Sequence, residues 1–177
     1  MRRVALVLLG YLLLVVLGPA WRITPFEVVV PNLALIMAAY FGITAREHIA
    51  GATAAAVIVG YLSDLLGGSP IGLMAFLAGV GCIGARVVTA RLLVRGRGFI
   101  FVLLSAMSVV AAGLSYGLRV YHGAGRAPLA NELLIALGCA LVTGTLALPV
   151  FRLCRMVDAR FARTEREREA VREGFLN

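Results

Sequence analysis

The stretch YLSDLLGGSPIGLMAF, residues 61–76, contains one carboxylate, Asp64, near the end of an apolar run and just before a Gly-Gly-Ser-Pro turn. The turn has the residue types that end one helix and begin the next. Gly67 or Gly68 suits a left-handed cap, the serine suits an N-cap, and the proline suits the first helical position. Because apolar segments flank the turn on both sides, the stretch predicts a tight hairpin of two transmembrane helices.

Asp64 is placed in the last turn of the first helix of this hairpin, where the helix dipole disfavours an anion. The amino end of the returning helix favours one. We therefore expect Asp64 to lock the hairpin by accepting hydrogen bonds from the amides or the hydroxyl of residues 69–72. An ionisable group in a membrane segment is also a candidate for binding a partner or a substrate. The sequence leaves both roles open.

The composition is that of an integral membrane protein. Of the 177 residues, 61% are hydrophobic, whereas a soluble domain is about half apolar, and the mean hydropathy is +0.95. A membrane-spanning helix needs about 20 mostly apolar residues. Six segments of this kind are found, at about residues 4–20, 28–43, 49–66, 70–90, 99–121 and 133–153. We expect an all-α integral membrane protein with six transmembrane helices in a compact bundle, residues 1–153, and a charged cytosolic helical tail, residues 154–177.

The first apolar segment is also similar to a secretory signal peptide. Two arginines, an apolar stretch and the small residues around Gly18 and Ala20 follow one another as in such a peptide. The apolar run is long for a signal sequence, and the distribution of arginines fits six spans. We therefore expect a retained helix.

The basic residues predict the topology. All 17 are arginine, and assigning alternate loops to the two sides of the membrane places fourteen of them on one side. By the positive-inside rule this side is cytoplasmic, and so are both termini. Arg86, Arg91, Arg95 and Arg97 then form a basic region suited to anionic lipid or to a cytosolic protein. Since this topology accounts for the pI of about 10.4, we expect no nucleic-acid partner.

The sequence offers little support for chemistry other than binding. The three cysteines show no CxxC spacing, and the two histidines belong to different loops or helix ends, so neither a metal site nor a disulfide is expected. HExxH, GxSxG and a glycine-rich phosphate loop before a lysine are missing from the sequence. We expect no enzyme, no catalytic residues and no cofactor.

Pro31 and Asn32 stand near the start of the second apolar segment, and they predict a helix start because proline is tolerated in the first helical turn. Asn32 then faces either a neighbouring helix or the headgroups.

Two runs, VVVPNLALIMAAYFGI (residues 28–43) and VIVGYLSDLLGGSPIGLMAFLAGVGCIGARVV (residues 57–88), resemble the bacterial MreD family of rod shape-determining proteins. The family pattern is a proline followed by Asn or Asp at the opening of an apolar helix. An apolar run ending in Asp, a small-residue turn and an apolar-Gly step come later. The matching positions here are Pro31, Asn32, Asp64, Leu65, Leu66, Gly67, Gly68, Ser69, Pro70, Ile71 and Gly72. The last two apolar segments show no signature of the family, and the charged tail is longer than the family leads us to expect.

The resemblance implies a non-enzymatic scaffold subunit of the cell-elongation machinery in the bacterial cytoplasmic (inner) membrane. Its expected partners are MreC above all, then the glycosyltransferase RodA with its class B penicillin-binding transpeptidase, and the actin-like MreB filament. Anionic lipids are expected at the arginines.

The family is also similar in fold to the substrate-binding subunits of energy-coupling-factor vitamin transporters, which gives the alternative function. A vitamin site at the outer face would use Asp64, Glu27, Asn131 and Glu132, with the aromatic residues Tyr61 and Trp21. Such a site needs several convergent hydrogen-bonding groups in one cavity. Because the sequence offers few of them, we favour the scaffold.

Overall fold

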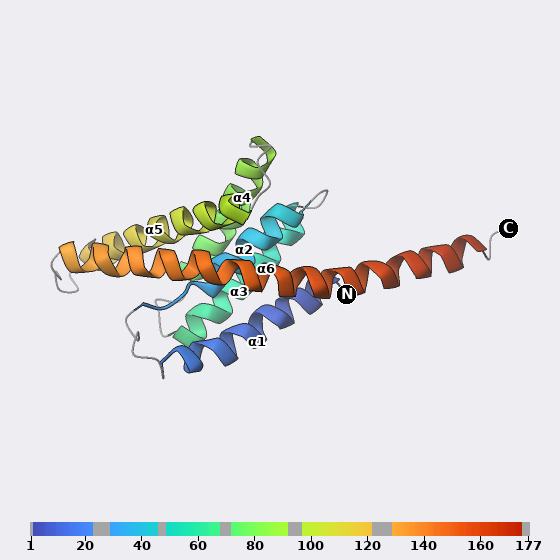
Figure 1. Ribbon diagram of the computed structural model, residues 1–177, viewed down its shortest axis with the longest axis horizontal. Helices are drawn as coiled ribbons and strands as arrows, with labels where there is room; N and C mark the ends of the chain where they lie inside the picture. Colours follow the sequence, from blue (N-terminus) through green and yellow to red (C-terminus); the bar gives the residue numbers. More distant parts are fainter. Residues whose placement is uncertain are drawn as a thin grey trace.

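A computed structural model describes the backbone of residues 2–22, 29–45, 49–67, 72–91, 97–121 and 129–174, and the side chains of the same residues except 2, 22, 97 and 161–174. The described residues form six α-helices (Figure 1). They are α1 (Arg2–Arg22), α2 (Leu33–Thr44), α3 (Ile49–Gly67), α4 (Leu73–Arg91), α5 (Arg97–Tyr121) and α6 (Leu129–Gly174). The predicted all-α class is confirmed for the part of the chain that the structure describes.

Five of these helices are long and apolar enough to cross a membrane, and the sixth, α2, is short. With 12 residues, α2 rises about 18 Å, whereas the hydrocarbon core of a bilayer is about 30 Å thick. The prediction of a helix over residues 28–43 was wrong at its start, because residues 29–32 are not helical. Pro31 explains the difference, since it disfavours the helical conformation at the residue before it.

α2 lies at the centre of the bundle, and its residues 33–42 are all buried. It packs mainly against α3 and α4 and also contacts α1, α5 and α6. A helix that is apolar all round is suited to such a central position. Gly42 allows α4 to come close, because a Cβ at this position would overlap the carbonyl group of Cys82. Small residues at helix contacts are typical of membrane bundles.

α3 and α4 form the most extensive helix pair of the bundle. The predicted hairpin of two apolar helices is therefore observed, although the turn itself, residues 68–71, lies outside the described residues. Gly60 of α3 faces the first turn of α4, where a Cβ would lie 2.5 Å from the Met74 carbonyl oxygen. The two backbones can approach this closely only because position 60 has no side chain.

α6 is one continuous helix of 46 residues. It begins at Leu129, four residues before the predicted start, and its backbone stays helical through the predicted boundary between residues 153 and 154. In Figure 1 its first part runs beside α5, and its C-terminal part, coloured red, extends away from the other helices. The backbone of residues 154–174 therefore continues α6, and its role as a cytosolic tail stays a prediction.

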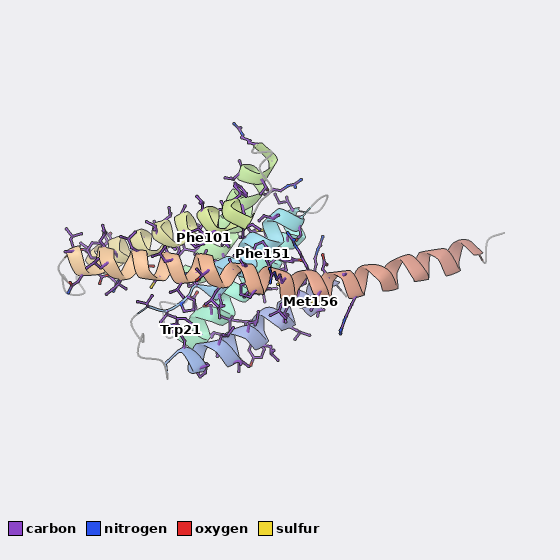
Figure 2. The ribbon with its side chains drawn as sticks, viewed as in Figure 1. Trp21, Phe101, Phe151 and Met156 are labelled. Atoms are coloured by element: carbon purple, nitrogen blue, oxygen red, sulfur yellow. The ribbon has the colours of Figure 1, made fainter. Side chains whose placement is uncertain are left out.

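The middle of α6 is fixed to α2 by aromatic and sulfur contacts. Phe151, labelled where α6 crosses the bundle in Figure 2, lies edge-to-face with Tyr40, with ring centroids 5.2 Å apart. Cys154 Sγ lies 3.6 Å from Met37 Sδ. The hydroxyl of Tyr40 donates to Asp158 Oδ2 at 3.5 Å. These contacts hold α6 in one register on the central helix.

Candidate functional site

Asp64, near the end of α3, is bound by the backbone of the following helix. Its side chain is fully enclosed, with 1% of the residue exposed. Oδ2 accepts from the amides of Gly72 at 2.9 Å, Met74 at 3.1 Å and Ala75 at 3.3 Å. Oδ1 also accepts from the Met74 amide, at 3.1 Å. The carboxyl group therefore connects the end of α3 to the beginning of α4.

The local geometry of Gly72 explains why α4 needs this carboxyl group. Gly72 has a φ of +98°, which favours glycine, and its carbonyl accepts the first helical bond, from Phe76 N at 2.9 Å. It is thus the N-cap of α4, but it has no side chain that could accept from the second and third amides of the helix. Those amides belong to Met74 and Ala75, and Asp64 accepts from both. Asp64 caps α4 from another helix, and the dipole of α4 favours its negative charge.

The predicted start of this helix was wrong. The sequence placed Ser69 at the N-cap and Pro70 at the first helical position, whereas α4 begins at Leu73. The positive φ of Gly72 prevents a helix from passing through that residue. Gly67 is the last residue of α3 and not a left-handed cap, while Gly68 and Pro70 lie outside the described residues.

Of the donors predicted for Asp64, the structure describes the Gly72 amide, which does bind the carboxyl group. Residues 69–71 lie outside the described residues. The bonds from Met74 and Ala75 were not predicted, because the expected helix start was three residues too early.

Asn32 caps α2 and faces neighbouring helices. Its Oδ1 accepts from the backbone amide of Leu35 at 3.3 Å, and its backbone N–H donates to Thr143 Oγ1 of α6 at 3.0 Å. The prediction that Pro31 and Asn32 mark a helix start is confirmed, but Pro31 precedes the cap and does not lie in the first turn. Of the two surroundings left open for Asn32, the neighbouring helices are the ones observed.

Met74 brings the two parts of the MreD-like pattern together. Its amide donates to Asp64, and its sulfur lies 3.6 Å from Asn32 Nδ2. The start of α2, the end of α3 and the start of α4 therefore meet at one residue, and Thr143 adds α6 to the same place. Sequence reasoning missed Met74 and Thr143. A signal existed for Thr143, since it is a hydroxyl residue in an apolar helix, where such groups bind across helices.

The non-helical segment before α2 is held by its neighbours. Backbone polar groups at membrane depth need partners inside the protein. The carbonyl of Val29 accepts from the indole nitrogen of Trp21 at 2.7 Å, and the side chain of Val29 packs on Gly138 of α6, where a Cβ would lie 3.2 Å away. Figure 2 shows Trp21 at the end of α1. The alternative vitamin site was predicted to use Trp21, and the indole nitrogen of Trp21 makes this hydrogen bond within the protein.

The other predicted site residues are arginines near the ends of α4 and α5. Arg86 lies within α4 and is half-buried. Arg91 is the exposed last residue of α4, and Arg97 is the first residue of α5. Arg95 lies outside the described residues. Their contact with lipid or with a cytosolic protein stays a prediction.

Arg119, near the end of α5, and Glu132, in the first turn of α6, form an ion pair, with Nη2 and Oε2 3.1 Å apart. The sequence also predicts Asn131 and Glu132 as a capping pair at the start of the last helix. This was wrong, because α6 begins at Leu129 and both residues lie within its first turn. Among the described residues, no group of three or more His, Cys, Asp or Glu side chains could hold a metal ion.

The fold and this site define a class: an all-helical, multi-pass membrane protein whose ionisable group inside the bundle is used to cap a helix. The family model of the rod shape-determining protein MreD matches residues 1–157 of the chain, which include Asn32, Asp64 and Thr143. The chain belongs to the MreD family, as the sequence predicted, and has a role in rod shape determination. Comparisons with curated proteins and with solved structures gave no significant match.

Proposed function

We propose that this protein is a non-enzymatic membrane scaffold of the cell-elongation machinery, which binds MreC and links it to the wall synthases. The proposed synthases are RodA and its class B penicillin-binding transpeptidase, with MreB filaments on the cytoplasmic side. Membership in the MreD family supports a place in the shape-determining complex. The distribution of arginines supports an inner-membrane protein with both termini in the cytoplasm.

The observation that carries the proposal is the enclosure of Asp64. The one carboxyl group of the α3–α4 hairpin that lies inside the bundle accepts from three backbone amides of its own chain. A carboxyl group with these three hydrogen bonds stabilises the hairpin, and it is poorly placed to bind a solute as well. The hairpin is thereby a preformed element that a partner can recognise without first ordering it, which lowers the entropic cost of association.

The vitamin-binding alternative receives less support from the same polar residues. Trp21 donates to the Val29 carbonyl, and Glu132 pairs with Arg119. Tyr61 is exposed on the surface of α3, and Glu27 lies outside the described residues. A vitamin site needs several such groups turned toward one cavity.

The test is purification of the tagged full chain from its own cells in mild detergent after crosslinking in vivo, with mass spectrometry of the proteins that come with it. We expect MreC together with wall-synthesis enzymes. A membrane coupling subunit with paired ATPases, in the absence of MreC, would contradict the scaffold and favour a vitamin transporter.

A further inference from the structure

α6 has one exposed face that runs along its whole membrane part. Its members recur at spacings of three, four or seven residues, which are those of a helix that packs on another helix. They are Leu134, Leu141, Thr145, Pro149, Arg152 and Met156. Leu141 and Met156 are each 57% exposed, and Figure 2 labels Met156 where α6 leaves the bundle. We call this surface the Thr145 face.

Thr145 lies at membrane depth. Glu132 and Arg152 are the charged residues on either side of the apolar part of α6. A helix rises about 1.5 Å per residue, so these two residues are separated by about 30 Å, the thickness of the hydrocarbon core. Thr145 falls between them and is exposed.

Pro149 leaves the Thr145 carbonyl without its helical donor. Proline has no N–H, so it cannot donate to the carbonyl four residues earlier. The Thr145 hydroxyl does not replace that donor, because it donates to the carbonyls of Leu141 at 3.0 Å and Val142 at 2.9 Å. A backbone carbonyl that has lost its helical donor is disfavoured against hydrocarbon, and acyl chains have no donor to offer. A polar group of a neighbouring helix that covers this point of the face can supply one.

Arg152 adds a charge at one end of the same face. It is exposed, and no ion pair joins it to an acidic residue among the described parts of the chain. Asp158, the next acidic residue along α6, contacts Tyr40 of α2. The Thr145 face thus combines exposed apolar side chains, a backbone acceptor in the middle and a cation near the end.

We propose that the Thr145 face is the docking surface for one transmembrane helix of a partner membrane protein. The partner helix places a hydroxyl, amide, phenol or indole donor against the Thr145 carbonyl and an acidic group near Arg152. The inference rests on the proposed scaffold function, for which it names the surface that holds a membrane partner. A second copy of this chain is a poor occupant, since a symmetric pair would put Arg152 against Arg152 and acceptor against acceptor.

The first experiment places a photoreactive amino acid at Leu141 in the full chain, in the membrane of its own cells. The matched control position is Leu12, which is 58% exposed on α1. We expect Leu141 to crosslink to an apolar segment of another protein that contains a hydrogen-bond donor, and Leu12 to crosslink to lipid. Crosslinks from Leu141 to lipid alone, or to a second copy of this chain, would overturn the proposal.

The second experiment combines this crosslinker with Pro149→Ala, which restores the missing amide and occupies the Thr145 carbonyl. Hydrogen bonds between membrane helices correspond to about three- to thirtyfold in affinity, so we expect the crosslink yield to fall by about that factor. The thermal unfolding temperature should stay the same or rise, because the substitution repairs the helix. Pro19→Ala is the matched control, since it makes the same substitution inside α1, away from the Thr145 face, and should keep the crosslink.

The outcomes separate this inference from the proposed function. If MreC comes with the wild-type chain and Pro149→Ala changes neither its recovery nor the crosslink, the Thr145 face is wrong and the scaffold function stands. If no shape-determining protein comes with the wild-type chain, the proposed function fails, and the inference fails with it.

Discussion

The backbone amide of Asn32 donates to the hydroxyl of Thr143 at 3.0 Å, and this bond joins the start of α2 to the middle of α6. The amide precedes the first turn of a helix, where no intrahelical acceptor exists for it. Thr143 is completely buried, so water is no substitute. A single hydroxyl in α6 therefore allows a short helix to begin inside the bundle.

Thr143→Val should destabilise the protein. Valine keeps the shape of threonine but removes the acceptor, and a buried amide left without a partner costs about 1–3 kcal/mol. We expect a lower thermal unfolding temperature for the purified chain in detergent. Thr145→Val is the matched control, because that hydroxyl binds only carbonyls of its own helix. An equal drop in unfolding temperature for both variants would show that the Asn32–Thr143 hydrogen bond contributes no more to stability than the bonds of Thr145 within its own helix.

Asp64→Ala should destabilise the α3–α4 hairpin. Three amides at the start of α4 lose their acceptor, and losing a helix cap costs about 0.5–2 kcal/mol even at an exposed site. We expect lower accumulation in the membrane and a lower unfolding temperature, with Asp64→Asn in between because only one of its side-chain atoms accepts. Ser63→Ala, at the neighbouring position, is the control.

The same variants separate the two roles that the sequence leaves open for Asp64. A structural cap predicts that stability and the binding of every partner decline together. Normal accumulation and an unchanged unfolding temperature for Asp64→Ala, with the loss of one partner alone, would instead assign Asp64 to that partner.

The helices could be predicted from hydropathy because a bilayer demands long apolar segments with internal hydrogen bonding. Five of the six segments correspond to helices long enough to span. The exception, α2, shows the limit of this argument: residues 28–30 are as apolar as the helix after them, but Pro31 and the Thr143 contact make the helix begin at Leu33. Hydropathy reports burial in lipid and not which residue starts the helix.

The candidate site was predictable in part. The spacing of Asp64 before a Gly-rich turn indicated a carboxyl group facing the start of the next helix, which is a local consequence of the hairpin. The contacts of Asn32 with Met74 and Thr143 join residues distant in the sequence. A single sequence gives no indication of which helices lie side by side, so these contacts needed the structure.

Glu132→Gln should change stability little. The Arg119–Glu132 pair is exposed at the end of the α5–α6 hairpin, with 54% and 22% of the two side chains accessible. Exposed ion pairs contribute about 0–1 kcal/mol. We expect unfolding temperatures close to wild type for Glu132→Gln and for Arg119→Gln, with the small difference fading as salt is added. A large loss in both variants would mean that this end of the hairpin is held by the pair.

Gly60→Ala should disrupt the packing of α3 on α4. A Cβ at position 60 would lie 2.5 Å from the Met74 carbonyl oxygen and 2.7 Å from the Ala75 Cα, both backbone atoms that can move only with the helix. The same shift would pull the Met74 and Ala75 amides away from Asp64. We therefore expect a loss of at least about 1–3 kcal/mol, seen as a lower unfolding temperature and poor accumulation in the membrane.

Gly84→Ala is the matched control for Gly60→Ala, because it makes the same change within α4. A Cβ at position 84 would meet no atom of another helix within 4 Å. Alanine there should be neutral or slightly stabilising, since it favours the helix over glycine. Equal behaviour of the two variants would contradict the close approach of α3 and α4 at Gly60, because only that approach distinguishes the two positions.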